Sequence, residues 1–227
     1  MKALFQPTER ILIVAAHPDD ETLGMGGSIH RLSRSGCAIR VVFMSDGISS
    51  RDTKRESIEE RQKASLSALL ELGVDDIHFS SNPDNKLDTL PLLELAKQIE
   101  NHVFAFKPSL VFTHFPLDLN IDHKLVSQAT QVACRPKVSV CVKALLFFEV
   151  PSSTNWYFGV EQFSPNYYID ISQDWNYKEK ALAAYSVEMN EYPDARSIEN
   201  LHNLSKFRGA FMGILAAEAF QIAYVKE

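Results

Sequence analysis

Short apolar runs, rich in β-branched and aromatic residues, alternate with segments of helical periodicity along most of this chain. Such alternation is typical of an α/β fold with a mostly parallel sheet. Gly36 and Gly73 stand where helices of this pattern should end, because glycine readily takes the left-handed conformation that closes a helix. We predict strands at 11–16, 39–45, 77–80, 109–114, 142–149 and 166–171, helices at 22–35, 56–72, 89–106, 123–133, 175–188 and 197–221, and a long loop over 151–168.

The chain has 227 residues, of which 45% are hydrophobic, and this suits one core and a single domain spanning 1–227. Its net charge of -6 provides no basic surface for nucleic acid or for an anionic membrane, so we expect a small-molecule partner. The amino-terminal residues lack the features of a signal peptide, and no run of about 18 apolar residues predicts a membrane span. We therefore expect a cytoplasmic protein, a compartment that also suits three cysteines without a Cys-x-x-Cys pair.

Two polar clusters follow predicted strands. The first, "HPDDE" at 17–21, comes directly after the strand at 11–16. Ligands of open α/β sheets bind outside the carboxyl ends of the strands, so we expect both clusters at one edge of the sheet, sharing one site. The second cluster comes at the end of the strand at 109–114 and contains His114, Asp118, Asn120, Asp122 and His123.

The first cluster combines His17 with the acids Asp19 and Asp20. Pro18 fixes one backbone dihedral and bars a regular turn, so that His17 and Asp20 can point to a common position while Asp19 points elsewhere. With His123 they form the set of two imidazoles and one carboxylate that holds catalytic zinc. A bound divalent cation also keeps adjacent carboxylates ionised. The alternative is structural, because acids at a helix start are often caps and histidines at strand ends often only form hydrogen bonds.

Several motifs carry a resemblance to a known family. "AHPDDE" at 16–21, "SDG" at 45–47 and "DLNIDH" at 118–123 resemble the LmbE-like family of metal-dependent de-N-acetylases, also called the PIG-L family. "ERQKASLSALLELGV" at 60–74 resembles the family's arginine-bearing helix, and "RGAFMGILAAEAF" at 208–220 resembles a segment of its bacterial members. The resemblance covers most of the chain, with 135–175 the least matched. It implies a Rossmann-like three-layer α/β sandwich with a mostly parallel sheet.

The resemblance also implies a function, which is zinc-dependent removal of the acetyl group from an N-acetylated amino sugar or its small-molecule conjugate, commonly of the N-acetylglucosaminyl type. Carried over residue by residue, it makes His17, Asp20 and His123 the ligands of one zinc ion per chain and Asp19 the general base. Zinc lowers the pKa of a bound water to about 7, and Asp19 could then take a proton and pass it to the leaving amine. Family members often form trimers or hexamers, and the sequence leaves open whether this chain forms such a homo-oligomer.

Asn120 stands where many family members carry a second histidine, three residues before the metal-binding one. An asparagine can donate a hydrogen bond to an oxyanion but cannot transfer a proton at neutral pH. Three explanations stay open for the leaving amine: Asp19 shuttles the proton in both directions, His114 reaches in from the end of its strand, or activity is weak. We favour the first, with Asn120 as oxyanion donor and Asp122 orienting its neighbours at the metal site.

Four residues are candidates for substrate binding: Arg61, Asp46, Asp84 and His114. Arg61 matches the family's helical arginine and could hold sugar hydroxyls or a phosphate, although such arginines are more often solvated. Asp46 and Asp84 follow strands at the same edge and could accept hydrogen bonds from sugar hydroxyls, or could only stabilise turns. Aromatic residues at 156–158 and 163 suit stacking on a sugar ring, and equally suit packing in a core or between subunits.

Two other functions stay open. A metal-dependent phosphoester hydrolase would need a second metal about 4 Å from the first with bridging carboxylates, for which Glu21, Asp118 and Asp122 are available. A non-catalytic protein that binds zinc and a sugar would keep the metal ligands without the hydrolysis. A nicotinamide enzyme is disfavoured, because "LGMGG" at 23–27 does not match G-x-G-x-x-G. We expect these glycines to let their helix pack closely against the sheet.

Overall fold

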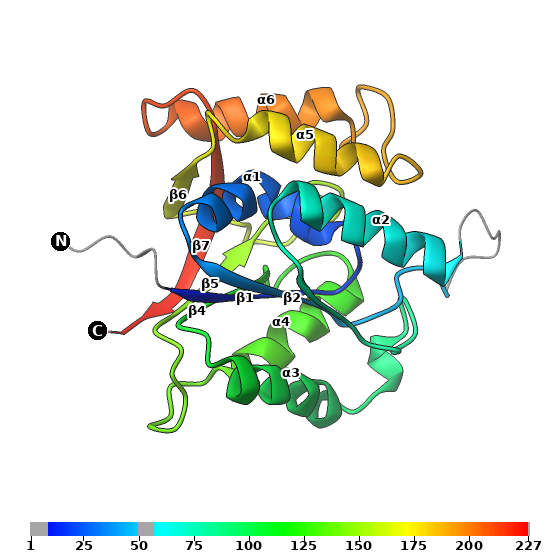
Figure 1. The fold of residues 1–227 in the computed structure, drawn as a ribbon, viewed down its shortest axis with the longest axis vertical. Helices are drawn as coiled ribbons and strands as arrows, with labels where there is room; N and C mark the ends of the chain where they lie inside the picture. Colours follow the sequence, from blue (N-terminus) through cyan, green and yellow to red (C-terminus); the bar gives the residue numbers. More distant parts are fainter. Residues whose placement is uncertain (1–8, 50–56, 227) are drawn as a thin grey trace.

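The computed structural model describes residues 9–49 and 57–226, and it is a three-layer α/β sandwich (Figure 1). The sheet order is β3-β2-β1-β4-β5-β7-β6, in which β1 to β5 run parallel and β7 runs antiparallel to both of its neighbours. The strands are β1 (Arg10–Ala15), β2 (Ala38–Phe43), β3 (Asp76–Phe79), β4 (Leu110–His114), β5 (Ala144–Phe148), β6 (Tyr167–Asp170) and β7 (Ala217–Val225). The α-helices are α1 (Asp20–Arg34), α2 (Ile58–Glu71), α3 (Leu92–Phe106), α4 (Ile121–Ala133), α5 (Trp175–Ala184) and α6 (Ile198–Ala210), with short 3-10 helices η1 (Leu87–Thr89) and η2 (Thr154–Trp156). The predicted fold class is confirmed.

Both faces of the sheet are covered, with α1, α2, α5 and α6 on one face and α3 and α4 on the other (Figure 1). The central strand β1 is therefore apolar on both sides, as strands of a covered parallel sheet are. Ile11 and Ile13 pack into the core on the α1 face, whereas Leu12 and Val14 pack into the core on the α3 face. All four side chains are fully buried, so the chain that leaves β1 starts from a rigid support.

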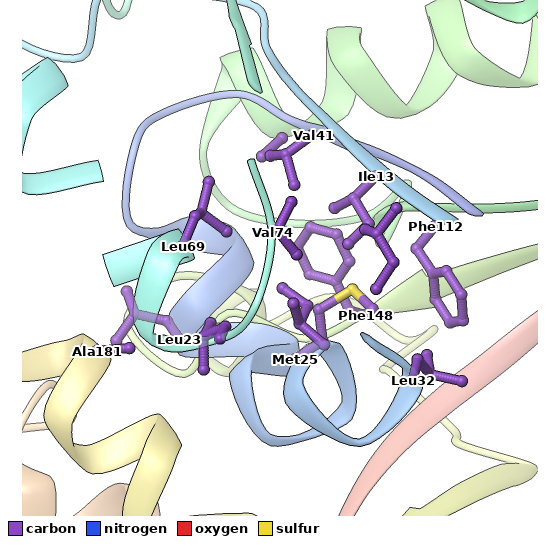
Figure 2. Packing of buried hydrophobic residues seen from close by; sticks show 14 of the residues in the cluster. Ile13, Leu23, Met25, Leu32, Val41, Leu69, Val74, Phe112, Phe148 and Ala181 are labelled. Carbon is purple, nitrogen blue, oxygen red and sulfur yellow. The ribbon is translucent and has the colours of Figure 1, made fainter. Parts of the chain in front are cut away.

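Helix α1 lies directly against the sheet (Figure 2). A β-carbon on Gly24 would lie 2.6 Å from the Phe148 ring and 2.9 Å from the carbonyl oxygen of Glu149, and one on Gly27 would lie 2.9 Å from Ile171. Contacts this short are not tolerated by real β-carbons, so the glycines allow the close approach. This agrees with the packing role expected from the sequence.

A kink at Met25, whose φ is -149°, divides α1 into two segments. The second segment begins with Gly27 and Ser28, and their backbone N–H groups donate to the Glu218 carboxylate at 3.1 and 2.6 Å. A carboxylate stabilises a helix start because it accepts hydrogen bonds from N–H groups that have no partner within the helix. The Lys178 ammonium lies 2.6 Å from Glu218 and neutralises this buried charge.

The predicted helix at 197–221 is wrong in its second half. Helix α6 ends at Ala210, and the chain then turns at Gly213, whose φ is +69°, and continues as β7. Ala and Glu favour helices in isolation, but strand pairing with β5 and β6 decides the conformation here. The strand also places Glu218 at the kink of α1.

The other predicted elements are present with shifted ends. The predicted first residue of the helix at 56–72 lies outside the described residues, while Gly36 and Gly73 end their helices with φ values of 92° and 78°. Cys37 and Cys134 are buried and Cys141 is exposed, and none of the three forms a disulfide in the described part of the chain. Within the described parts of the chain, no helix is both long enough and apolar enough to cross a membrane.

Candidate metal centre and its cavity

The turn after β1 brings His17 and Asp20 together. The backbone N–H of His17 donates to Asp20 Oδ2 at 2.9 Å, and the backbone N–H of Asp20 donates to the His17 carbonyl at 3.3 Å. Pro18 lies inside this turn, and a β-carbon on Gly47 would lie only 2.7 Å from Pro18 Cδ. Gly47 of the "SDG" segment therefore allows the loop after β2 to pack against the turn.

His123 completes a triangle with these two residues. The distances from His17 Nδ1 to Asp20 Oδ2, from His17 Nδ1 to His123 Nε2, and from His123 Nε2 to Asp20 Oδ2 are each 3.2 Å. His123 lies in the first turn of α4, which follows β4, and β4 pairs directly with β1. Adjacent parallel strands thus bring together donors that are 106 positions apart in the sequence, as predicted.

Carboxylates on the far sides of both rings determine which nitrogen points inward. His17 Nε2 lies 3.2 Å from Asp84 Oδ1 and 3.3 Å from Asp122 Oδ2. His123 Nδ1 lies 3.2 Å from Asp118 Oδ1. When these outer nitrogens carry the hydrogen, His17 Nδ1 and His123 Nε2 have free lone pairs directed at Asp20, which is the arrangement of metal-binding histidines.

The donor set fits zinc. Separations of 3.2 Å are close to the ~3.3 Å expected between tetrahedral ligands that lie about 2.0–2.1 Å from the ion. The second oxygen of Asp20, Oδ1, is buried without a hydrogen-bond partner among the described residues. Burial lowers the pKa of His123, but the Asp20 and Asp118 carboxylates outweigh it and raise that pKa to about 9. The centre therefore has an excess of negative charge that a divalent cation would balance.

Asp19 lies beside this triangle in a strained backbone conformation, with a φ of 127°. Its N–H donates to Glu21 Oε2 at 3.0 Å, and the Tyr185 hydroxyl donates to Glu21 Oε1 at 2.9 Å. Burial, together with the nearby Asp19 charge, raises the pKa of Glu21 to about 7. The third acid of "HPDDE" thus supports the strained peptide, and it does not cap α1.

The Asp19 carboxylate faces two arginines. Arg196 Nη1 donates to Asp19 Oδ2 at 2.8 Å, and Arg61 Nη1 lies 3.9 Å from the same oxygen. Arg61 is 1% exposed and also pairs with Glu188 at 2.7 Å, so it is a buried ion-pair partner and not a solvated surface residue. Burial raises the pKa of Asp19 and the Arg196 charge opposes that rise, with a net shift upward.

A cavity of about 130 Å³ opens over the triangle. Six of the residues predicted from the sequence line it, and the larger part of its exposed lining is polar. The cavity is lined by His17, Asp19, Gly47, Arg61, Asp84, Asn85, Asn120, His123, Ser152, Ser153 and Arg196.

Asn120 has a structural task as well as a place in the cavity wall. Its Oδ1 accepts hydrogen bonds from the backbone N–H groups of Asp122 at 2.8 Å and His123 at 3.4 Å, so it is the N-cap of α4. Its Nδ2 donates to Asn85 Oδ1 at 3.2 Å and carries a second hydrogen. Asn120 therefore holds the first turn of α4, where His123 lies, in a defined position.

Besides Asp20, three predicted residues lie outside the cavity lining. Asp122 Oδ2 lies 3.3 Å from His17 Nε2, and its role in orienting the metal site stays a prediction. Asp46 accepts hydrogen bonds from the N–H groups of Ile48 and Ser49, which is the turn-stabilising alternative. His114 is fully buried behind His123, with ring centroids 4.0 Å apart, and its Nε2 accepts the N–H of Ala16 at 2.8 Å. Substrate contact by Asp46 or His114 stays a prediction that this placement does not favour.

Sequence reasoning missed Arg196 and the two serines of the cavity. Ser153 Oγ lies 3.2 Å from His123 Nδ1 and donates to Asp118 Oδ2 at 3.1 Å, and Arg196 Nε donates to Ser152 Oγ at 2.8 Å. These residues come from irregular segments, where neither periodicity nor a motif marks a position. Asp118, a candidate bridging ligand for a second metal, has its Oδ1 3.2 Å from His123 Nδ1, where it can orient that ring.

Comparison with known proteins decides the family. The model of the PIG-L family, described as GlcNAc-PI de-N-acetylase, matches residues 12–134, which is more than half of the chain. The chain belongs to this family. The matched part contains the whole triangle and the acids that orient it.

Two curated relatives are deacetylases by name. "Uncharacterized deacetylase YaiS" of Escherichia coli is 33% identical over 148 residues, which are 63% of this chain and 75% of YaiS. "Diacetylchitobiose deacetylase" of Thermococcus kodakarensis is 25% identical over 204 residues, which are 82% of this chain and 73% of that protein. Both alignments are long enough to extend beyond any single motif.

Solved structures share the fold at lower identity. The conserved protein TT1542 from Thermus thermophilus has a TM-score of 0.79, with 23% identity and 97% of each chain covered. The 4-carboxy-2-hydroxymuconate hydratase GalB from Pseudomonas putida has a TM-score of 0.78, with 19% identity, covering 97% of this chain and 98% of that one. Since a hydratase shares the fold, the fold alone does not determine the reaction.

Proposed function

We propose that this protein is a zinc-dependent deacetylase that hydrolyses the acetamide of an N-acetylated amino sugar or of its small-molecule conjugate, of the N-acetylglucosaminyl type. The observation that carries the proposal is the triangle of His17 Nδ1, Asp20 Oδ2 and His123 Nε2 beside the Asp19 carboxylate. Those three donors would hold one zinc ion per chain. A bound zinc would supply Lewis acidity there, able to lower the pKa of water to about 7 and to polarise the acetyl carbonyl.

Asp19 is the proposed general base. It follows the ligand His17 in the same turn but contributes no atom to the triangle, and its Oδ2 is held by Arg196 at 2.8 Å. Its carboxylate lines the cavity and can accept a proton from the attacking water. The same group then gives that proton to the departing amine, because Asn120 has no proton to transfer.

Asn120 is the proposed oxyanion donor. Its oxygen is held by the N–H groups of α4, so the Nδ2 group is fixed at the cavity wall. A donor that is already oriented stabilises developing negative charge without reorganising. His114 is a poor alternative acid, because its Nε2 already accepts the backbone N–H of Ala16. Burial and the neighbouring His123 charge also hold the pKa of His114 well below its ordinary value.

The size of the cavity supports a binding mode in which only the acetylated sugar ring of the substrate enters the cavity. About 130 Å³ is small beside the roughly 300–1,000 Å³ of sites that enclose a whole drug-sized ligand. Arg61 and Asp84 in its wall are proposed to contact sugar hydroxyls. The remainder of a conjugate would then lie outside the cavity. The relative that acts on diacetylchitobiose supports an N-acetylglucosamine unit as the group that enters.

The phosphoester alternative is less well supported. A second candidate cluster consists of His17, Asp84 and Asp122, and it uses His17 Nε2, on the opposite side of the ring from Nδ1. An imidazole between two ions would hold them farther apart than the ~4 Å of carboxylate-bridged metal pairs. A count of bound zinc separates the two functions, since one ion per chain supports the deacetylase and two support the phosphoesterase.

The test is release of a free amine from a panel of N-acetylglucosamine conjugates that includes N,N'-diacetylchitobiose. We expect the zinc-loaded protein to release amine, and we expect Asp19→Asn to retain one zinc while kcat falls by about 10²–10⁴-fold. Asp76→Asn is the matched control, because Asp76 also pairs with an arginine, Arg40 at 2.9 Å, but on β3 away from the cavity. Zinc binding without any turnover on this panel would favour the non-catalytic zinc and sugar-binding protein. Assembly into trimers or hexamers stays a prediction.

A further inference from the structure

Arg196 lies on the segment between α5 and α6, 177 residues after Asp19, yet it forms part of the cavity wall. Its Nη1 donates to Asp19 Oδ2 at 2.8 Å and to Glu188 Oε2 at 3.3 Å. Its Nε donates to Ser152 Oγ at 2.8 Å. The guanidinium is thus anchored on two other sides, and it presents a fixed donor to Asp19.

These contacts make the two oxygens of Asp19 inequivalent. Oδ2 is occupied by Arg196 and lies 3.9 Å from Arg61 Nη1. Oδ1 forms no hydrogen bond with any residue in the described part of the chain, and it is not sealed from solvent. Because Asp19 lines the cavity, Oδ1 is the oxygen that is free to act there. Rotation of the carboxylate would break the bond to Arg196.

We propose that Arg196 is a positioning residue that holds Asp19 Oδ2 so that Oδ1 faces the acetamide, an inference that rests on the function proposed above. The covalent chemistry stays with Asp19, and Arg196 contributes by restricting its orientation. Misplacing a catalytic group by about 1 Å can cost 10²-fold in rate. A merely structural arginine would instead anchor the segment before α6 and affect stability or substrate affinity.

The test compares Arg196→Ala with Arg40→Ala. Arg40 is a matched control because it also pairs with an aspartate, Asp76, and lies away from the cavity. Its side chain is 18% exposed, against 23% for that of Arg196. For Arg196→Ala we expect one zinc per chain, a kcat lowered about 100-fold and a KM within about threefold of wild type. Guanidinium at millimolar concentration should raise the kcat of Arg196→Ala at least tenfold. The kcat of Arg196→Lys should lie between those of Arg196→Ala and wild type.

A crystal structure of zinc-loaded Arg196→Ala provides a readout that needs no substrate. We expect the Asp19 carboxylate to leave its wild-type orientation. An unmoved carboxylate, a kcat within threefold of wild type, or a loss confined to KM would each overturn the inference. If wild type releases no amine from any conjugate, the proposed function fails, while the orientation of Asp19 in the variant still decides the role of Arg196. If Arg196→Ala does not fold, Arg196→Lys and Ser152→Ala are compared in the same way.

Discussion

Removing the Asp118 carboxylate is expected to weaken zinc binding without removing a zinc ligand. Asp118 Oδ1 lies 3.2 Å from His123 Nδ1 and accepts the N–H of Asn120 at 2.8 Å, while its Oδ2 accepts the Ser153 hydroxyl at 3.1 Å. The carboxylate thereby fixes the tautomer and the ring orientation of His123. Loss of such an orienting partner typically costs 10–100-fold in metal affinity, which is about 1.4–2.7 kcal/mol.

The affinity is measured by competition against a chromophoric zinc chelator. We expect the Kd for zinc to rise 10–100-fold in Asp118→Ala and less in Asp118→Asn, whose amide oxygen can still accept the hydrogen bonds made at Oδ1, including the one from His123. Asp76→Ala is the control for loss of a carboxylate elsewhere. Equal zinc affinity of Asp118→Ala and wild type, within twofold, would refute the idea that Asp118 orients a ligand.

Three further changes test the surrounding structure. Gly47→Ala should destabilise the protein by about 2–3 kcal/mol in urea unfolding, because φ is +73° and the new β-carbon would lie 2.7 Å from Pro18 Cδ; an unchanged midpoint would contradict this packing. Burial and nearby positive charge lower the pKa of His102 to about 4, so the wild type should lose more melting temperature than His102→Gln as pH falls from 6.5 towards 4; parallel losses would show that His102 is not responsible. Lys178→Met should cost about 3–5 kcal/mol, since it leaves Glu218 buried without its cation; a loss below about 1 kcal/mol would contradict this.

The central strands could be predicted because their apolar runs are continuous. Sequences such as "ILIVAA" and "VVFM" are buried on both faces of the sheet. Strands of this kind are apolar at every position, so they can be recognised as continuous apolar runs. Strand β7 could not be predicted in this way. Its alanines and Glu218 favour a helix locally, and only pairing with β5 and β6 makes it a strand.

In the candidate site, too, some residues could be predicted from the sequence and others could not. His17 and Asp20 share a turn, and His123 follows a neighbouring strand, so general rules for parallel sheets were enough to bring them together. Arg196 reaches Asp19 only through the folding of the segment after α5, which carries no periodic pattern. The positions of Asp118 and Asp84 beside the two histidine rings could not be predicted, because a sequence carries no local signal for ring orientation.

Zinc titration of the metal-free protein, followed by release of amine from an N-acetylglucosamine conjugate, tests the central claim most directly. The account predicts that turnover is absent without metal, rises with each addition of zinc and reaches its maximum at one ion per chain, and that His123→Ala abolishes this response. Full turnover by chelator-treated protein that contains no metal would contradict it, and so would a requirement for two ions.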